Sequence, residues 1–349
     1  MSLSIGIVGL PNVGKSTLFR ALTKKQVDVS NYPFCTIDPS VGVVAVPDPR
    51  LGKLAALNKS VKKIPGTVEF VDIAGLVKGA AKGEGLGNKF LSHIREVDAI
   101  AHVVRGFNDD NIIHVEGKVD AEADKSTIEL ELILADLETV TKHFDKLTKL
   151  VRGHDKISAK KLPVVEKIKI TLENEKLAGT LQFDEEELEL IKELNLLTLK
   201  PVIQVLNVDE EDAAKSHEDY IAISAKIEAE IAELSSEEQK SYLTDLGLTE
   251  AGLDRLAREG YKTLDLITFF TSGPEETRAW EIPRGTTAPG AAGVIHTDFE
   301  EKFIKAEVIG YDDYIGAGSE NAAKEAGKMH LEGKEYIVQD GDVIFFHHG

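Results

Sequence analysis

The stretch Gly9-Leu-Pro-Asn-Val-Gly-Lys-Ser16 decides the fold of this 349-residue chain. It matches the pattern G-x-x-x-x-G-K-[ST] at every fixed position, and it follows the apolar run Leu3–Val8, which we expect to be the first parallel strand. Its two glycines let the backbone turn tightly so that successive N–H groups converge on a polyphosphate, and the helix that follows adds the positive end of its dipole. The sequence therefore predicts a nucleoside triphosphate site in the N-terminal half.

Two side chains of this loop have specific predicted roles. Lys15 would reach the β- and γ-phosphates and serve catalysis, and the Ser16 hydroxyl would ligate Mg²⁺. The other nucleotide contacts are expected from the rest of the loop and the first helical turn. The full predicted set here is Asn12, Val13, Gly14, Lys15, Ser16 and Thr17.

Two further segments predict the remainder of the Mg²⁺ and γ-phosphate site. Thr36 lies in a polar stretch before the apolar strand Val41–Val46, where a switch-type NTPase places its second Mg²⁺ ligand. A second apolar strand begins at Val68 and ends in Asp72-Ile-Ala-Gly75. The aspartate can hold Mg²⁺ through water, and the glycine N–H can contact the γ-phosphate during hydrolysis.

The residue after this motif is Leu76, which has no group that could orient the attacking water as glutamine does in Ras-like enzymes. Three sources of activation remain open: His114 in a polar loop, K⁺ bound near Asn12, or a group from a partner. His114 is equally compatible with an ordinary surface position. His102, inside the apolar run Ala99–Val104, is more compatible with a core histidine than with a catalyst.

The predicted strand Lys200–Asn207 ends in Asn207-Val-Asp-Glu210, where guanine-specific GTPases have Asn-Lys-x-Asp. Val208 lacks the long stem that stacks on the base, and Glu210 is longer than aspartate by one methylene, so the contacts that select GTP are weakened. Ser224, just after the last predicted strand, is expected beneath the base. The interval between Asn207 and Tyr220 is short, because a parallel crossover ordinarily contains a helix.

The segment 121–199 has long helical periodicity and predicts a helical hairpin inserted into the nucleotide domain. Between residues 142 and 169 it carries nine Lys/Arg and three acidic residues, a local balance of +6 in a chain of formal charge −19. This basic tip is compatible with an RNA-facing surface or with a solvated helix face. The negative total excludes a generally basic nucleic-acid coat, and no DNA partner is expected.

Composition limits the remaining possibilities. No apolar run approaches the ~20 residues of a membrane span, and the single cysteine, Cys35, excludes an internal disulfide. We therefore expect a cytoplasmic monomer without a membrane partner. Residues 277–349 have short strands, turns and no catalytic constellation, which predicts a small docking domain after a nucleotide domain at 1–276.

Several longer motifs resemble the YchF/Obg-like ATPase family, in the Obg branch of P-loop NTPases. They are Gly-Leu-Pro-Asn-Val-Gly-Lys-Ser-Thr, Asn-Tyr-Pro-Phe-Cys-Thr-Ile-Asp-Pro, Phe-Val-Asp-Ile-Ala-Gly-Leu-Val-Lys-Gly-Ala, Asn-Ile-Ile-His-Val, Thr-Ala-Pro-Gly-Ala-Ala-Gly-Val-Ile-His-Thr-Asp-Phe-Glu and Glu-Tyr-Ile-Val-Gln-Asp-Gly-Asp-Val. The resemblance implies an α/β fold with a doubly wound, mainly parallel sheet, a coiled-coil insertion and a C-terminal β-grasp (TGS) domain.

For function, the resemblance implies ATP preferred over GTP, Mg²⁺ as cofactor and partners on the ribosome. It marks Leu76 as the family's hydrophobic substitution and His114 as its candidate for assisting hydrolysis. The expected function is an ATP-dependent switch in translation or stress regulation. Two alternatives stay open, namely a GTPase of ribosome assembly and a nucleotide-gated adaptor whose hydrolysis is incidental.

Overall fold

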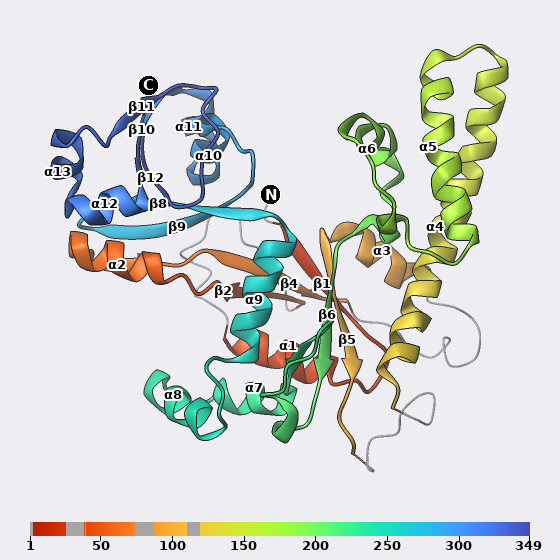
Figure 1. Ribbon diagram of the computed structural model, residues 1–349, viewed down its shortest axis with the longest axis horizontal. Helices are drawn as coiled ribbons and strands as arrows, with labels where there is room; N and C mark the ends of the chain where they lie inside the picture. Colours follow the sequence, from red (N-terminus) through yellow and green to blue (C-terminus); the bar gives the residue numbers. More distant parts are fainter. Residues whose placement is uncertain (1–2, 26–37, 39, 74–86, 110–118) are drawn as a thin grey trace. The chain divides into compact units, whose positions relative to one another are not determined.

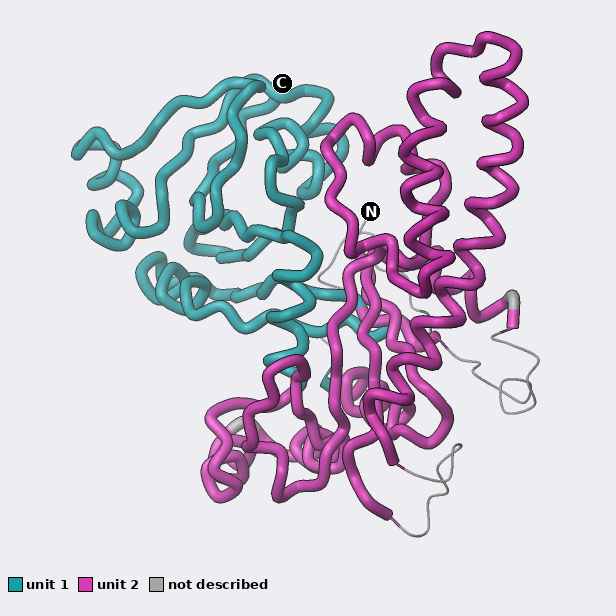
Figure 2. Tube along the Cα trace, turned by 45° about the vertical axis from the view of Figure 1, so that its right-hand side comes forward, with its two compact units in different colours: residues 1–2, 25–69, 253–349 teal, residues 3–24, 70–252 magenta. Residues whose placement is uncertain are grey.

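The computed structural model describes residues 3–25, 38, 40–73, 87–109 and 119–349 (Figure 1). Three predicted site residues, Thr36, Gly75 and His114, lie outside the described residues. The chain divides into two compact units (Figure 2): unit 1 comprises residues 1–2, 25–69 and 253–349, and unit 2 comprises residues 3–24 and 70–252.

Unit 2 is built on a parallel sheet. The strand order β4-β1-β5-β6-β7 joins β4 (Thr67–Asp72), β1 (Ser4–Val8), β5 (Ala99–Arg105), β6 (Val202–Asn207) and β7 (Ile221–Ile223). The pairs β1·β5, β5·β6 and β6·β7 are parallel. Every residue of β5 is buried, as expected for a central strand covered on both faces. The predicted α/β class and parallel sheet are confirmed.

Four helices of unit 2 accompany these strands. They are α1 (Lys15–Lys24), α3 (Asn88–Glu96), α7 (Ala225–Ile231) and α8 (Ser236–Asp245). The first begins inside the phosphate loop, because the N–H groups of Thr17 and Leu18 both donate to Gly14 O, at 3.1 and 3.0 Å. The helix therefore presents its N-terminal end at the carboxyl edge of β1.

The inserted hairpin consists of α4 (Ala121–Arg152) and α5 (Lys156–Glu173), followed by α6 (Glu185–Ile191) and the short helices η3 (Ala178–Thr180), η4 (Lys192–Leu194) and η5 (Leu197–Leu199) (Figure 1). Asp120 and Asp155 cap α4 and α5 through their side chains. The buried Asp136 of α4 accepts bonds from the N–H groups of Leu197 and Thr198 at 3.0 and 2.7 Å. This contact anchors the hairpin to the segment that enters β6, which confirms the predicted helical insertion.

The crossover between the parallel strands β6 and β7 is short. Only the single turn η6 (Glu210–Asp212) lies between these parallel strands. Ala213 of the crossover joins the apolar cluster of β6, β7 and α7, and Tyr220 packs against it. The Tyr220 hydroxyl donates to Glu122 of α4 at 2.5 Å. The hairpin and these two residues thus contact the region where a crossover helix would otherwise pack.

Unit 1 contains a second sheet of order β11-β10-β12-β8-β9-β3. Its strands are β3 (Lys62–Ile64), β8 (Leu266–Ser272), β9 (Glu276–Pro283), β10 (Phe303–Gly310), β11 (His330–Glu332) and β12 (Asp342–His348). The parallel pair β12·β8 lies between antiparallel pairs, and Trp280 stacks on Phe269 in its core. The predicted domain limits stay predictions; in the structure, β8 precedes residue 277 and pairs with β9.

The other elements of unit 1 are β2 (Val41–Ala45), α2 (Pro49–Asn58), α9 (Gly252–Thr263), whose first residue is the last of unit 2, α10 (Ala288–Ile295), α11 (Thr297–Glu301), α12 (Tyr311–Ala317) and α13 (Glu320–Glu325). Two apolar clusters hold this unit together, one around α10 and the other beneath α2 and α12.

His102 makes unit 2 sensitive to acid. Its side chain on β5 is 2% exposed, and burial, with a smaller contribution from Lys125, lowers its pKa from 6.5 to about 4. Between these two pH values His102 is protonated in the unfolded chain but neutral in the folded chain. The free energy of unfolding therefore falls as the pH drops from 6.5 toward 4, by up to about 3 kcal/mol.

We expect His102→Gln to reduce this loss in urea unfolding followed by circular dichroism at pH 7 and pH 5. The partly exposed His93, on α3, provides the control variant His93→Gln, which should retain the wild-type pH dependence. Equal pH dependence in all three proteins would contradict the assignment of the effect to His102.

Candidate nucleotide-binding site

A cavity of about 1170 Å³ lies at the carboxyl ends of β1, β4, β5, β6 and β7 in unit 2. Ligand sites in open α/β sheets occur at this edge, where loops follow parallel strands. Nearly all the predicted site residues in the described part of the chain line it. They are Asn12, Gly14, Lys15, Ser16, Thr17, Asp72, Asn207, Val208, Glu210 and Ser224.

The phosphate loop has the backbone that its glycines predict. Gly14 has φ +89°, and a Cβ there would lie 2.0 Å from Asn207 Nδ2. A Cβ on Gly9 would lie 2.4 Å from Val103 O. Asn12 also has a positive φ, 66°, which asparagine tolerates better than most residues. Close packing against β5 and β6 therefore requires glycine at both loop positions.

Val13 contributes to the site differently from its neighbours. Its side chain is 1% exposed, so only its backbone can face a nucleotide. Its carbonyl oxygen accepts a bond from Asn207 Nδ2 at 2.9 Å. The buried side chain anchors the loop to the core of unit 2.

Asn207 connects the two halves of the site. Besides donating to Val13 O, its amide oxygen accepts from Ala225 N at 3.0 Å, and the residue is 6% exposed. The side chain thus ties the phosphate loop to the loop after β7. The sequence predicts Asn207 among the nucleotide-binding residues, and the bonds of its amide in the structure position the backbone on either side of the cavity.

Lys15 and Asp72 form an ion pair in the cavity. Lys15 Nζ also lies 3.4 Å from Ile73 O, and the Ser16 side chain lines the same space. A serine hydroxyl and a carboxylate are oxygen ligands of the kind that Mg²⁺ takes together with phosphate and water. Ser16 and Asp72 therefore fit the predicted metal site, and Thr36, the third predicted ligand, lies outside the described residues.

The base end of the cavity differs from a guanine site. Val208 is 4% exposed and packs in the apolar cluster of β6, β7 and α7. Glu210 forms an ion pair with Lys226 at 2.5 Å, and the bond raises the pKa of Lys226. Ser224 lies beside them with 3% exposure. The carboxylate that would meet guanine thus already contacts Lys226 of the loop Ser224-Ala-Lys226.

Phe107 is a residue of the cavity that sequence reasoning missed. It follows β5 and lines the cavity, and the guanidinium of buried Arg105 lies 4.3 Å from its ring centroid. Arg105 Nε also donates to Phe107 O at 3.1 Å. Asn108 N donates to Asp209 Oδ2 at 3.2 Å, which joins this loop to the loop after β6. An aromatic residue directly after a buried strand was the available sequence signal.

Two family models match separate parts of the chain. The model MMR_HSR1, described as "50S ribosome-binding GTPase", matches residues 4–208. The model YchF-GTPase_C, described as "Protein of unknown function (DUF933)", matches residues 266–349. "Ribosome-binding ATPase YchF" from Bacillus subtilis is 53% identical over 362 aligned residues, covering 99% of each chain. The chain belongs to the YchF family.

Other YchF relatives agree over the full length. "Ribosome-binding ATPase YchF" from Haemophilus influenzae is 54% identical over 359 aligned residues, covering 99% of each chain. The solved structure of the Schizosaccharomyces pombe YchF GTPase superposes with a TM-score of 0.89 at 40% identity, covering 99% of this chain and 98% of that one. The names of these YchF proteins differ in the nucleotide that they give, ATP or GTP. The base end of the cavity is therefore the region that bears on nucleotide preference.

Among the residues that the structure describes, none of the helices is long and apolar enough to cross a membrane.

Proposed function

We propose that this YchF-family chain is a ribosome-associated NTPase that binds and hydrolyses ATP in preference to GTP and acts as a nucleotide-dependent switch in translation or stress regulation. Relatives named ribosome-binding ATPase support the activity and the partner. The observation that carries the nucleotide preference is the base end, where Val208 is buried and Glu210 is held by Lys226. Its test is a comparison of ATP and GTP dissociation constants.

The chemistry follows from the charges in the cavity. Mg²⁺, when bound, supplies positive charge to the phosphate oxygens during transfer. Ser16 and Asp72 would hold it, and Lys15 would then exchange its contact with Asp72 for the β- and γ-phosphates. Each charge keeps an opposite partner through this exchange, so neither Lys15 nor Asp72 is left uncompensated in a partly buried site.

Selection against GTP follows from the same residues. A guanine N1 and N2 edge needs a carboxylate at the distance that aspartate provides, whereas Glu210 is longer by one methylene and its Oε1 contacts Lys226. Phe107 offers a ring face to either purine, which binds without distinguishing them. The base end of the cavity thus lacks a carboxylate suited to guanine, while the Phe107 ring remains to stack on a base.

We expect Val208→Lys combined with Glu210→Asp to increase GTP affinity by about 1–3 kcal/mol, because both guanine contacts are restored. The new lysine can extend along the cavity, since Val208 lines it. Dissociation constants for ATP and GTP measure the effect, and Glu211→Asp is the control, because Glu211 also lines the cavity. Tighter binding of GTP than ATP by the unaltered protein would refute the proposed preference.

His114 is the proposed group for activating water, with K⁺ near Asn12 as the alternative. A group acting after binding lowers kcat and leaves affinity unchanged. We therefore expect His114→Ala to reduce kcat in K⁺ and in Na⁺ buffer with nearly unchanged ATP affinity. If the kcat of His114→Ala equals that of wild type in both buffers, activation by a partner remains. If ATP hydrolysis by the wild-type protein depends on K⁺, the cation is favoured.

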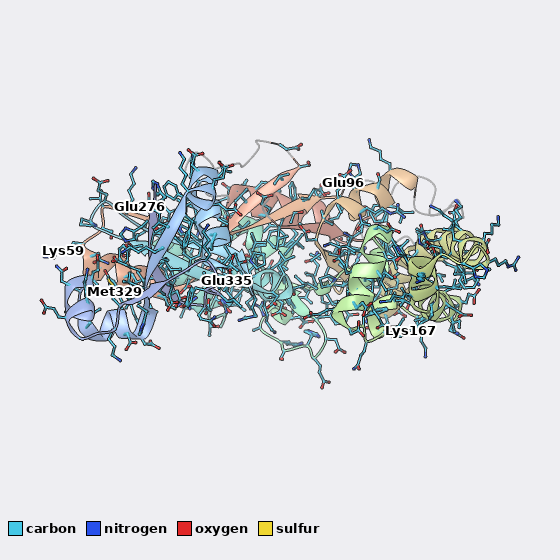
Figure 3. The ribbon with its side chains drawn as sticks, turned by 90° about the horizontal axis from the view of Figure 1, so that it is seen from above. Lys59, Glu96, Lys167, Glu276, Met329 and Glu335 are labelled. Carbon is cyan, nitrogen blue, oxygen red and sulfur yellow. The ribbon has the colours of Figure 1, made fainter. Side chains whose placement is uncertain are left out.

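The proposed ribosomal contact includes RNA at the basic tip, which comprises the Lys/Arg residues between 142 and 169. Part of the tip is engaged within the protein: Lys167, labelled in Figure 3, lies 3.7 Å from Glu187, and Lys160 contacts Glu186 at 2.9 Å. Lys149 and Arg152 are exposed and have no ion-pair partner in the part of the chain that the structure describes. These residues near the turn remain available for phosphates.

Single-turnover hydrolysis with and without ribosomes separates this proposal from an adaptor with incidental turnover. Faster hydrolysis on ribosomes supports the switch, and unchanged hydrolysis supports the adaptor. A ribosome-assembly GTPase would instead turn over GTP faster than ATP. A cytoplasmic monomer is part of the same proposal.

A further inference from the structure

A second cavity, of about 420 Å³, lies at the base of the hairpin within unit 2. It is lined by residues of α3, of one face of α4 and of η4. Leu91, Ala135 and Leu194 contribute apolar surface, and Arg95, Lys142, His143 and Lys146 contribute basic groups. None of these residues lines the nucleotide cavity. The composition resembles that of a small-molecule site, with apolar walls and a few convergent polar groups.

The charges in this cavity are not balanced internally. Lys142 Nζ pairs with Glu138 Oε1 at 2.6 Å, which neutralises both residues. Neither Arg95 nor Lys146 has an ion-pair partner among the described residues. Two cations from different helices therefore face one space in a chain of formal charge −19.

His143 also lines this cavity and has a ring nitrogen without a hydrogen-bond partner among the described residues. Its Nε2 is buried and has no hydrogen-bond partner among the described residues, and the nearest carboxylate, Glu193, lies 3.7 Å away. Glu193 in turn contacts Lys161. A buried polar atom without a partner is costly, so a ligand that bonds to it gains affinity.

We propose that this cavity is a second anion site, which takes the phosphate group of a phosphate ester. Two unpaired cations match the two charges of a phosphate dianion, and the Arg95 guanidinium can bond its oxygens in a bidentate fork. Leu91, Ala135 and Leu194 suit the uncharged part of the ester. The phosphate can belong to a free ester, as a dianion, or to an RNA chain, in which two neighbouring monoanionic phosphodiesters would supply the two charges. In the RNA case Arg95 would extend the proposed basic tip, to which Lys142 and Lys146 already belong.

A phosphate bound in this cavity would connect two helices of unit 2. Arg95 is on α3, the next described element after Asp72 of the nucleotide cavity, and Lys146 is on α4 of the hairpin. A phosphate bonded to both would hold α3 against α4. The site thereby connects the hairpin to the helix that follows the Asp-x-x-Gly motif.

Binding is tested on the full-length protein with Mg·ADP saturating the nucleotide cavity. Phenyl phosphate, titrated by calorimetry, represents a free ester, and a fluorescein-labelled single-stranded RNA octamer, followed by anisotropy, represents a chain. The cavity variant is Arg95→Ala with Lys146→Ala. Its matched control is Lys176→Ala with Lys240→Ala, which removes the same charge from two exposed lysines of unit 2.

We expect the cavity variant to weaken at least one probe about tenfold or more, and the control to stay within about twofold. Ala135→Leu, which fills the floor without changing charge, should weaken the same probe. Loss confined to phenyl phosphate identifies a free ester, and loss confined to RNA identifies an RNA phosphate. Equal weakening by cavity and control variants, or no binding of either probe to wild type, would overturn the site.

ATP hydrolysis distinguishes this inference from the proposed function. Arg95 and Lys146 do not line the nucleotide cavity, so without ester or RNA the cavity variant should hydrolyse ATP at the wild-type rate. That rate also shows that the variant is folded. Absence of ATP hydrolysis in wild type would contradict the proposed function and leave the anion site to be judged by its own titrations.

Discussion

Lys15→Ala is expected to lower Mg²⁺-dependent ATP hydrolysis by about a thousandfold or more, the scale seen when a preorganised charge at a transferring group is removed. The Lys15 ammonium contacts Asp72 and lies near Ile73 O, both at the cavity. Its charge therefore serves the phosphates and contributes little to the core.

The variant should remain folded but lose about 1–3 kcal/mol of stability, because the Lys15 and Asp72 side chains are only 15% and 22% exposed and Asp72 loses its partner. Single-turnover hydrolysis and thermal unfolding provide the two measurements. Lys24→Ala is the control, since Lys24 ends the same helix and pairs with exposed Glu233. Turnover that survives in purified Lys15→Ala would refute the role assigned to the phosphate loop.

Asn207→Ala should reduce ATP affinity and also destabilise unit 2, by about 2–4 kcal/mol. The change leaves Val13 O and Ala225 N without their bonds, and each buried group without a partner costs about 1–3 kcal/mol. The phosphate loop then loses its connection to the loop after β7. Affinity falls because the backbone donors of the loop are no longer held in place.

Asn207→Asp keeps one of the two bonds of this side chain and removes the other. Aspartate retains the acceptor for Ala225 N but places a buried carboxylate oxygen against Val13 O in place of the donor, so its effect on stability should be at least as large as that of Asn207→Ala. Calorimetric ATP binding and urea unfolding measure both consequences. Asn174→Ala is the control because the Asn174 amide makes a single exposed bond to Ile170 O. Wild-type affinity and stability in Asn207→Ala would show that the bridge has no energetic role.

The phosphate loop and the sheet could be predicted because their signals are local. Gly9 and Gly14 are required by backbone geometry, and the apolar runs at β1, β5 and β6 reflect strands buried on both faces. Hairpin periodicity likewise reports burial along a helix, as in Val140, Leu147 and Val165. Each pattern depends on residues near one another in the sequence.

The cavity's second half could not be predicted in this way. Lys226 engages Glu210, and Asn207 bonds to Val13, only because parallel pairing brings the ends of β1, β6 and β7 to one edge. Such contacts join residues far apart in the chain, and their geometry depends on register and loop path. A motif specifies which side chains are present there, but not which atoms they bond.

The sequence by itself determined that this chain has a nucleotide-binding α/β domain. It also predicts Lys15, Ser16 and Asp72 for the phosphate end, because a lysine, a hydroxyl and a carboxylate suit a polyphosphate and its metal. Only the tertiary structure decided that Val208 is buried and that Arg95 of α3 meets Lys146 of α4 in a second basic cavity. Burial and the meeting of distant charges are set by packing between elements, for which a linear pattern contains no direct signal.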